Sequence, residues 1–279
     1  MLVFLNGHFV PEEKAVVSAF DRGFCYGDGL FETMRVVKGK PFRMAQHVER
    51  MVRGADFLKI RLPSSPKELQ QFAEQLIENN QMPDAVLRLT VTRGSGERGY
   101  SPKGADSPTV VMTLHPAPAL AANEPPSWRL ITATIRVPAD DPLTQFKTCN
   151  KLPQIVARAE AEAKGADEAL LVNTCGEAVE TAGANLFWVY HDKICTVPTG
   201  RGALPGITRA VVLELCQALG LTTKKRVIKP EALRSSEGLF LTQSVLGVVP
   251  VANLDGEPVK QSPLVEKLCC AYREMLAKA

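Results

Sequence analysis

A lysine and a glutamate within residues 146–187 are the side chains of this sequence that could most readily do chemistry together. Lys147 lies in the short segment FKTCN, and Glu180 follows in the segment EAVETAGANLF. A lysine amine acts as a nucleophile and a base near pH 7 when its surroundings lower its pKa. A carboxylate beside a heteroaromatic nitrogen raises the pKa of that nitrogen and keeps it protonated. The two residue types therefore indicate a site where an amine bonds a carbonyl carbon and a carboxylate faces an aromatic ring.

The same stretch resembles the class IV aminotransferases, which are the fold-type IV pyridoxal phosphate (PLP) enzymes. Their pattern places an asparagine soon after the lysine, here Asn150 after Lys147. It then places a glutamate ahead of a small residue, asparagine, an aliphatic residue and phenylalanine, here Glu180 ahead of 184–187. The resemblance covers nearly the whole chain. It implies that Lys147 forms a Schiff base with PLP and moves a substrate proton, while Glu180 pairs with the pyridine nitrogen.

The resemblance also assigns residues to the PLP phosphate. Arg50 lies at the position of an arginine that holds the phosphate, and a guanidinium suits that task because it offers a planar fork of donors. Ile207, through its backbone, and Thr208 match phosphate contacts at a helix start near Gly206, where unpaired N–H groups favour an anion. Ser244 matches a further phosphate contact. On spacing alone, Arg50 would be a solvated helix arginine and Gly206 an ordinary helix start.

Three positions correspond to substrate contacts in the resembling enzymes. Phe31 replaces a tyrosine that contacts substrate in D-amino-acid aminotransferases, so the ring is kept and the hydroxyl is lost. Arg98 matches an arginine that grips the substrate carboxylate, and Tyr100 stands where those enzymes have a histidine. A surface arginine is the alternative interpretation of Arg98.

Local motifs point to two reactions. The segments FETMRV and LPGITRAVV resemble the aminotransferases, whereas RGSGERGYS, ADEAL and ANLFW resemble the aminodeoxychorismate lyases. Lys151 stands where branched-chain aminotransferases usually have a tyrosine, which is closer to the lyase pattern. We expect an aminotransferase acting between an amino acid (D-amino, branched-chain or a related amine) and a 2-oxo acid. The alternatives are a lyase that produces 4-aminobenzoate and pyruvate, and a catalytically idle PLP-binding protein, against which the intact Lys147 and Glu180 argue.

Apolar periodicity and turn signals predict a mixed α/β (α+β) fold to position these residues. Strands are expected at 2–10 (a hairpin turning at Asn6-Gly7), 30–37, 85–92, 108–114, 129–137, 168–172, 186–190, 223–228 and 238–242. Helices are expected at 43–60, 66–80, 153–164, from 206 onward, at 230–235 and at 262–278. Lys147 is expected in an irregular segment, and 93–102 in a Gly-rich loop that lacks the GK(S/T) ending of a P-loop.

The resemblance implies two domains with the active site between them. We expect a smaller N-terminal α/β domain at 1–118, a Pro/Ala-rich linker at 119–128 and a larger PLP-binding α/β pseudo-barrel domain at 129–279. A homodimer is implied as well, with amino acid and keto acid substrates as the small-molecule partners.

Composition excludes several other classes of protein. The 279 residues carry a formal net charge of only +3, with Lys and Arg spread along the chain, so no nucleic-acid footprint is expected. No apolar run approaches the ~18 residues of a membrane span, and the start MLVFLNGHFVPEE does not resemble a signal peptide. The seven scattered cysteines are typical of reduced thiols, and the four histidines lack metal-ligand spacing. We therefore expect a cytoplasmic protein without a metal site.

Overall fold

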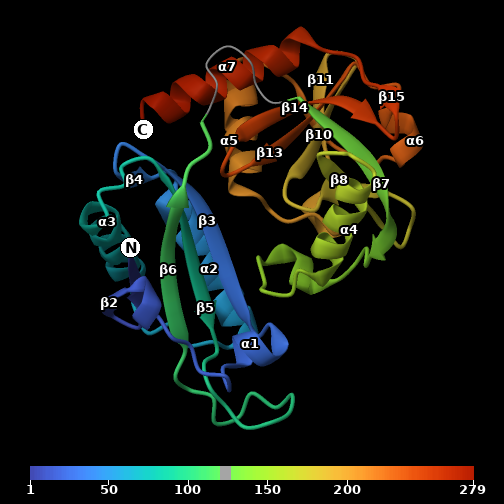
Figure 1. The fold of residues 1–279 in the computed structure, drawn as a ribbon. Coiled ribbons are helices and arrows are strands. Elements are labelled where there is room, and N and C mark those ends of the chain that lie inside the picture. Colours follow the sequence, from blue (N-terminus) through green and yellow to red (C-terminus); the bar gives the residue numbers. More distant parts are fainter. Residues whose placement is uncertain (120–126) are drawn as a thin grey trace. The chain divides into compact units, whose positions relative to one another are not determined.

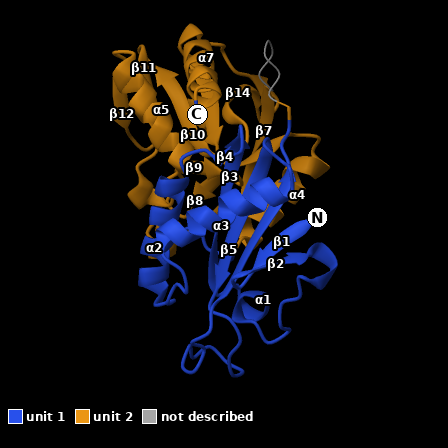
Figure 2. Ribbon diagram, turned by 90° about the vertical axis from the view of Figure 1, so that its left-hand side faces the viewer, with its two compact units in different colours: residues 1–118, 146–150, 279 blue, residues 119–145, 151–278 orange. Residues whose placement is uncertain are grey.

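A computed structural model describes residues 1–119 and 127–279 of the protein as two compact units (Figures 1 and 2). Unit 1 comprises Met1–Pro118, Phe146–Asn150 and Ala279, and unit 2 comprises Ala119–Gln145 and Lys151–Lys278. The linker expected at 119–128 falls mostly on 120–126, outside the described residues. The segment Phe146–Asn150 was expected in the C-terminal domain, but its contacts place it in unit 1. The domain boundaries themselves stay predictions.

Unit 1 is an antiparallel sheet with helices packed on it. The strand order is β2-β1-β6-β5-β3-β4. The strands are β1 (Leu2–Leu5), β2 (His8–Pro11), β3 (Gly29–Val37), β4 (Lys40–Pro41), β5 (Ala85–Thr92) and β6 (Thr109–Pro116). The helices are α1 (Arg22–Tyr26), α2 (Met44–Leu58) and α3 (Pro66–Asn79), with a 3-10 turn η1 at Glu12–Lys14. The predicted N-cap of α3 is confirmed, because Ser65 Oγ accepts from Glu68 N and the Glu68 carboxylate accepts from Ser65 N.

Alternation along β3 divides its side chains between two environments. Leu30, Met34 and Val36 are buried in the hydrophobic core that α2 and α3 form with the sheet. Phe31 and Thr33 point to the opposite face, where their cross-strand neighbours on β5 are Thr90 and Arg88. One strand therefore serves the core of unit 1 on one face and carries Phe31 and Thr33 on the other.

Unit 2 is a mixed sheet that closes on itself. Its strands are β7 (Trp128–Val137), β8 (Glu168–Asn173), β9 (Ala178–Thr181), β10 (Asn185–Tyr190), β11 (Lys193–Thr196), β12 (Thr223–Lys225), β13 (Gly238–Gln243), β14 (Gly247–Leu254) and β15 (Glu257–Pro258). Its helices are α4 (Leu152–Ala163), α5 (Ile207–Ala218), α6 (Pro230–Leu233) and α7 (Pro263–Ala277), with 3-10 turns η2 (Pro142–Gln145) and η3 (Thr199–Arg201). The order β10-β13-β14-β7-β8-β9 returns to β10, since Glu180 of β9 pairs with Asn185 of β10. This closure is the barrel-like arrangement expected for the C-terminal domain.

Most predicted elements are confirmed within one to three residues at each end, but several were missed or misjudged. The short helix α1 and the strands β11 and β14 were not expected. The strand expected at 223–228 ends at Lys225, because its partner β11 ends at Thr196 and offers it no further ladder. The residue after the strand, Arg226, donates the last such hydrogen bond to Thr196 O at 3.0 Å.

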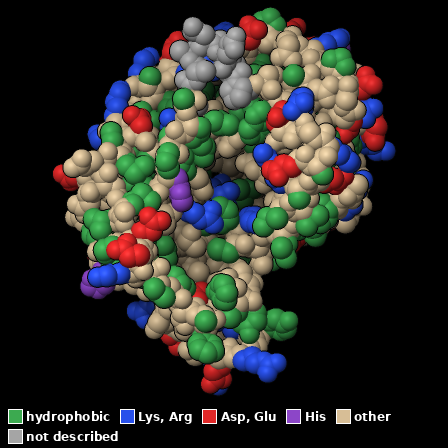
Figure 3. Space-filling view, viewed as in Figure 1, with side chains coloured by type: hydrophobic (Ala, Val, Ile, Leu, Met, Phe, Trp, Pro, Cys, Tyr) green, Lys and Arg blue, Asp and Glu red, His purple; other side chains and the backbone are tan. Residues whose placement is uncertain are grey.

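The surface of unit 2 mixes charges of both signs, as the right-hand part of the face in Figure 3 shows. Within the described residues, no helix is long and apolar enough to cross a bilayer. The same residues contain no cluster of three or more His, Cys, Asp or Glu side chains arranged to hold a metal ion.

Candidate active site

Main-chain hydrogen bonds on both sides fix Lys147 in unit 1. Phe31 N donates to Lys147 O at 2.9 Å, and Cys149 N donates to Gly29 O at 2.9 Å. The lysine lies outside any helix or strand, as predicted, yet its segment runs antiparallel to the start of β3 through a bridge between Leu30 and Thr148. This pairing explains why the segment belongs to unit 1.

The Lys147 amine shares an aromatic ring with a second cation. Its Nζ lies 4.6 Å from the centre of the Phe31 ring, and Arg88 Cζ lies 4.0 Å from the same centre. Arg88 is half-buried on β5, and this burial lowers the pKa of its guanidinium. Among the described residues, Arg88 has no hydrogen bond or ion pair. Cation–π attraction holds both groups near the ring and leaves the charge of Arg88 available to an anion.

Sequence reasoning missed Arg88. The signal was a single charged residue in the strand AVLRLTVT, where the alternating neighbours are buried and apolar. A charged side chain at such a position is also ordinary on a solvated face of a sheet, so the sequence alone did not single out Arg88. The structure therefore brings together Lys147 and Phe31, which were predicted, and adds Arg88.

The next residue of β3, Glu32, faces α2 and holds the predicted phosphate residue Arg50. Arg50 Nε donates to Glu32 Oε1 at 2.8 Å, and Arg50 Nη2 donates to Glu32 Oε2 at 2.6 Å. His47 Nδ1 lies 2.6 Å from Glu32 Oε2. Burial opposes ionisation of Glu32, but the hydrogen bonds with His47 and Arg50 prevail and lower its pKa to about 2. Burial lowers the pKa of His47. Arg50 is thus buried and oriented, not a solvated helix arginine.

The predicted substrate residues Arg98 and Tyr100 lie on the loop between β5 and β6. Tyr100 is 89% exposed, and the Arg98 side chain has no hydrogen bond or ion pair with the described residues. The loop is held by its backbone, because Arg22 donates to Gly99 O at 2.9 Å and to Tyr100 O at 3.2 Å. The Tyr26 hydroxyl accepts from Gly99 N at 2.9 Å. These hydrogen bonds join the loop to α1.

In unit 2, donors from Asn185 and Leu204 fix the Glu180 carboxylate. Asn185 Nδ2 donates to Glu180 Oε2 at 2.9 Å, and Leu204 N donates to the same oxygen at 3.0 Å. Asn185 also donates to Leu204 O at 2.8 Å, which joins β10 to the segment ahead of α5. On the other side of Asn185 in the sheet, Thr242 is buried and its Oγ1 has no hydrogen-bond partner.

The amino end of α5 lies directly beside this carboxylate. Gly206 is its N-cap and brings no side-chain cap, so the N–H groups of the first turn, including those of Ile207 and Thr208, keep their capacity for an anion. A Cβ on Gly206 would overlap Asn185 Oδ1, so a glycine is required there for space. Ser244 lies in the turn between β13 and β14, and the turn follows Thr242 closely.

Arg209, in the first turn of α5, is a second residue that sequence reasoning missed. It is buried, its Nη2 donates to Val197 O at 3.0 Å, and its Nε has no partner. Burial lowers its pKa, and the nearby Glu180 charge opposes that shift. The LPGITR pattern contained this residue, but a first-turn arginine was indistinguishable from a surface one.

Comparison with known proteins decides the family. The family model for amino-transferase class IV matches residues 29–254. The chain belongs to the class IV aminotransferases. A putative branched-chain-amino-acid aminotransferase of Methanocaldococcus jannaschii is 34% identical to it over 95% of this chain and 92% of that protein. The D-alanine aminotransferase of Staphylococcus aureus (strain MSSA476) is 31% identical over 95% of this chain and 94% of its own length.

Other relatives of this class IV aminotransferase extend the range of activities and confirm the fold. The aminodeoxychorismate lyase of Bacillus subtilis (strain 168) is 28% identical over 91% of this chain and 87% of that protein. The crystal structure of a T.th. branched-chain amino acid aminotransferase with pyridoxamine 5′-phosphate matches with a TM-score of 0.94 and 28% identity, over 99% of this chain and 94% of the other. The predicted fold-type IV class is confirmed, and the protein is a PLP-dependent enzyme.

The residues present fit PLP. The fixed carboxylate of Glu180, the unpaired hydroxyl of buried Thr242 and the uncapped start of α5 lie in one region of unit 2. A ring nitrogen and a phosphate are the two polar ends of PLP, and these groups complement both. Within unit 1, the amine of Lys147 and the buried guanidinium of Arg50 are the groups that were predicted to bind the cofactor.

Proposed function

We propose that this class IV aminotransferase transfers an amino group between an amino acid and a 2-oxo acid, with Lys147 as the catalytic amine. The observation that carries the proposal is the position of the Lys147 amine and the Arg88 guanidinium on the same Phe31 ring. An amino acid and a 2-oxo acid both carry a carboxylate, and a half-buried guanidinium without an anionic partner among the described residues is suited to bind one. The amine beside it is suited to act at the adjacent carbon.

The proposed roles rest on the family to which the chain belongs and, for Glu180, also on its contacts. Lys147 would hold the cofactor through Nζ, and its free amine would take the proton from the substrate Cα as a base and give it back as an acid. Glu180 keeps a proton on the pyridine nitrogen, and its donors Asn185 and Leu204 hold it in place. PLP, when bound, supplies the electron sink that makes the Cα proton acidic. Arg50, with Ile207, Thr208 and Ser244, anchors the phosphate.

Substrate orientation is proposed for residues of unit 1. Phe31 forms an apolar wall beside the amine, and Arg88 binds a carboxylate from the neighbouring strand. Arg98 and Tyr100 are proposed as further substrate contacts, because their loop is anchored by Arg22 while both side chains are exposed. With the substrate carboxylate bound by Arg88, Arg98 would bind a second polar group of the substrate.

The second candidate is elimination from aminodeoxychorismate to 4-aminobenzoate and pyruvate. The 28% identical lyase of Bacillus subtilis and the RGSGERGYS, ADEAL and ANLFW segments favour it. Lys147 and Glu180 would have the same tasks in that reaction, and an arginine carboxylate clamp would serve either substrate. The two reactions differ in their requirement for a 2-oxo acid, which the elimination does not need.

One titration separates the two reactions. Purified holoenzyme is mixed, without oxo acid, with D- and L-alanine, branched-chain amino acids and (R)-phenylethylamine, and the cofactor absorbance is followed. For the aminotransferase, a donor converts the visible band and a 2-oxo acid restores it. If no donor converts the band while aminodeoxychorismate yields 4-aminobenzoate, the lyase is correct. Lys147→Ala should abolish the band, and Lys67→Ala, an exposed lysine of α3, should leave it unchanged.

We further propose that the enzyme is a cytoplasmic homodimer. The segment ahead of and within α1 exposes Val16, Phe20 and Phe24 at 75%, 74% and 79%, an apolar group that a second copy could cover. The seven cysteines are all free thiols, which suits a reducing compartment. Light scattering after size exclusion tests the dimer: a paired Phe20→Ser and Phe24→Ser variant should shift the mass toward the monomer, and a wild-type monomer would refute the proposal.

A further inference from the structure

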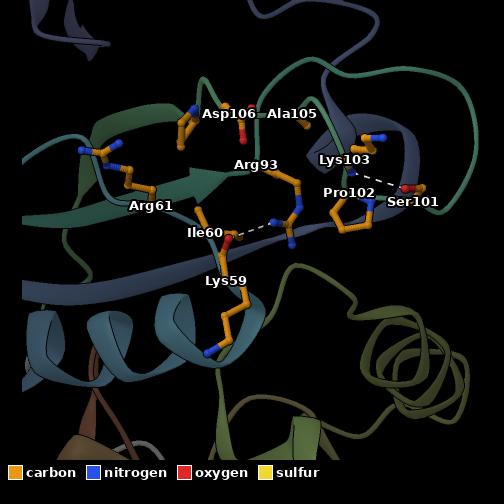
Figure 4. Close-up of a pocket in the computed structure, with 10 residues that line it drawn as sticks. Lys59, Ile60, Arg61, Arg93, Ser101, Pro102, Lys103, Ala105 and Asp106 are labelled. Carbon is orange, nitrogen blue, oxygen red and sulfur yellow. Dashed lines mark hydrogen bonds between the residues drawn. The ribbon is translucent and has the colours of Figure 1, made fainter.

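A pocket of unit 1 outside the proposed catalytic groups is surrounded by positive charge. It lies between the end of α2 and the β5–β6 loop, and its volume is about 260 Å³. Four of its lining side chains are basic, namely Lys59, Arg61, Arg93 and Lys103, whereas Asp106 is the one acidic side chain among the described residues that line it. In the view of Figure 4, Arg61 and Lys103 lie on opposite sides of the pocket and Arg93 extends between them.

The central arginine is fixed and largely neutralised. Arg93 is buried, donates twice to the Asp28 carboxylate at 2.7 and 3.1 Å, and caps α2 through Leu58 O at 2.8 Å and Lys59 O at 3.2 Å. It therefore shapes the pocket floor and joins the β-sheet to the end of α2. The hydrogen bonds from Arg93 to two helix carbonyls also offset the negative end of the α2 dipole, which would otherwise repel an anion.

The charges at the rim are not compensated. Lys59, Arg61 and Lys103 are exposed, and none of them has an ion pair among the described residues. Together with the negative charge of Asp106, these three basic side chains give the rim of the pocket a net charge of two positive units. Buried Ile60 and Ala105 supply apolar walls that lower the local dielectric and strengthen the attraction of an anion. The volume accommodates a phosphate group with several waters, since each water occupies roughly 30 Å³ of liquid.

We propose that this pocket binds a phosphate group, free or esterified, that bridges the end of α2 and the β5–β6 loop. Lys59 and Arg61 contact the anion from the α2 side, and Lys103 contacts it from the loop side. The bound anion thereby restrains the loop that also carries Arg98 and Tyr100. The effect on substrate binding rests on the roles proposed for those two residues, whereas binding of the anion does not.

Calorimetric titration of PLP-saturated holoenzyme with inorganic phosphate tests the proposal, at an ionic strength kept constant with chloride. Saturation with PLP blocks its phosphate site, so the remaining heat reports this pocket. Lys103→Gln and Arg61→Gln should each weaken phosphate binding about twofold to fivefold, the range of an exposed ion pair. Asp106→Asn should tighten it by a similar factor. Lys67→Gln, which removes an exposed charge from α3, is the matched control and should not change it.

Hydrogen exchange on the same samples tests the bridge. Phosphate should slow exchange of the amides at 99–108 in the wild type and slow it less in Lys103→Gln. Absence of phosphate binding to the PLP-saturated enzyme, or equal affinities in Lys103→Gln, Arg61→Gln and the Lys67→Gln control, would overturn the site. Binding without protection of the loop would overturn the bridge. None of these results depends on which amino donor the enzyme uses, so the proposed function can fail independently.

Discussion

Glu180 and Asn185 pair across β9 and β10 at the point where the barrel of unit 2 closes, and Asn185 Nδ2 donates to Glu180 Oε2 at 2.9 Å. The same amide group donates to Leu204 O, immediately ahead of the α5 start. The Asn185 side chain therefore joins three features. These are the pairing of β9 with β10, which we call the closing seam, the proposed partner of the ring nitrogen, Glu180, and the proposed phosphate site at the start of α5. A defect in Asn185 should affect the binding of both ends of the cofactor.

Asn185→Leu tests this joint role. The change removes the hydrogen bond that Asn185 donates to Glu180, so we expect PLP affinity to fall roughly tenfold or more, the range of a hydrogen bond to a charged group. Equilibrium dialysis against PLP measures the affinity. Asn79→Leu, at the exposed end of α3, is the control. Unchanged affinity in Asn185→Leu would show that Glu180 does not need the Asn185 donor to hold its position.

The buried pair of Glu32 and Arg50 makes a separate prediction. Glu32→Gln removes the charge that balances Arg50, and breaking a buried pair costs about 3–5 kcal/mol. We expect a lower free energy of unfolding in urea and weaker PLP binding, because the guanidinium loses its orientation. Glu49→Gln, at an exposed position of α2 whose pair with Arg53 is solvated, should change the stability by less than about 1 kcal/mol. Equal losses in the two variants would contradict the prediction.

Stability should depend on pH through the same group. The pKa of Glu32 is lowered from 4.5 to about 2 in the folded protein, so its ionisation stabilises the fold above pH 4.5 and this contribution is lost as the pH falls toward 2. The difference corresponds to about 3 kcal/mol. The pKa of His47 is also lowered in the folded protein. Below pH 6.5 the unfolded chain therefore binds this proton more readily than the folded protein, which adds a loss of stability of the same sign. Urea unfolding of the apoenzyme at a series of pH values should show this acid loss, and Glu32→Gln should flatten the part below pH 4.5.

Periodicity and turn chemistry predicted most of the fold. The bounds of β5 are as predicted because a buried apolar residue stands at every second position from Ala85 to Val91, and α3 begins at its Ser65 cap for a local reason. Pairings between distant segments were beyond this reasoning. The antiparallel bridge of Leu30 with Thr148 and the closure of β9 on β10 depend on long-range geometry that no local pattern encodes.

The residues of the candidate site also fall into two groups, those that the sequence predicted and those that only the structure revealed. Lys147 and Glu180 stood out because their residue types and flanking motifs resemble a known family. Arg88 and Arg209 did not, because a single arginine in a strand or a helix has the same local signature whether it is solvated or buried. Their importance appears only when burial and missing partners are known, and these are tertiary properties.

Arg88 should act on the substrate carboxylate and not on the amine. Arg88→Leu should lower kcat/KM for amino acid donors by about 10–100-fold, the range for losing a charged hydrogen bond. The rate with an amine that lacks a carboxylate, such as (R)-phenylethylamine, should fall much less if the enzyme accepts it. Arg88→Lys should recover part of the loss, because a point charge remains but the planar fork is gone. Equal losses for carboxylate and amine donors would assign Arg88 a structural role.

Gly206 provides a steric test of the closing seam, because it packs directly against Asn185. Its backbone is ordinary for any residue, with φ at −66°, so the requirement for glycine is purely one of space. In Gly206→Ala the new Cβ would overlap Asn185 Oδ1, and either the Asn185 amide or the start of α5 must move. Both movements disturb Glu180 or the phosphate site, so PLP affinity should fall while the far-UV circular dichroism stays native. Gly200→Ala, where nothing lies within 4 Å of the added Cβ, is the matched control and should bind PLP like the wild type. Normal PLP binding by Gly206→Ala would mean that the seam yields to a methyl group and that Asn185 does not position the cofactor site.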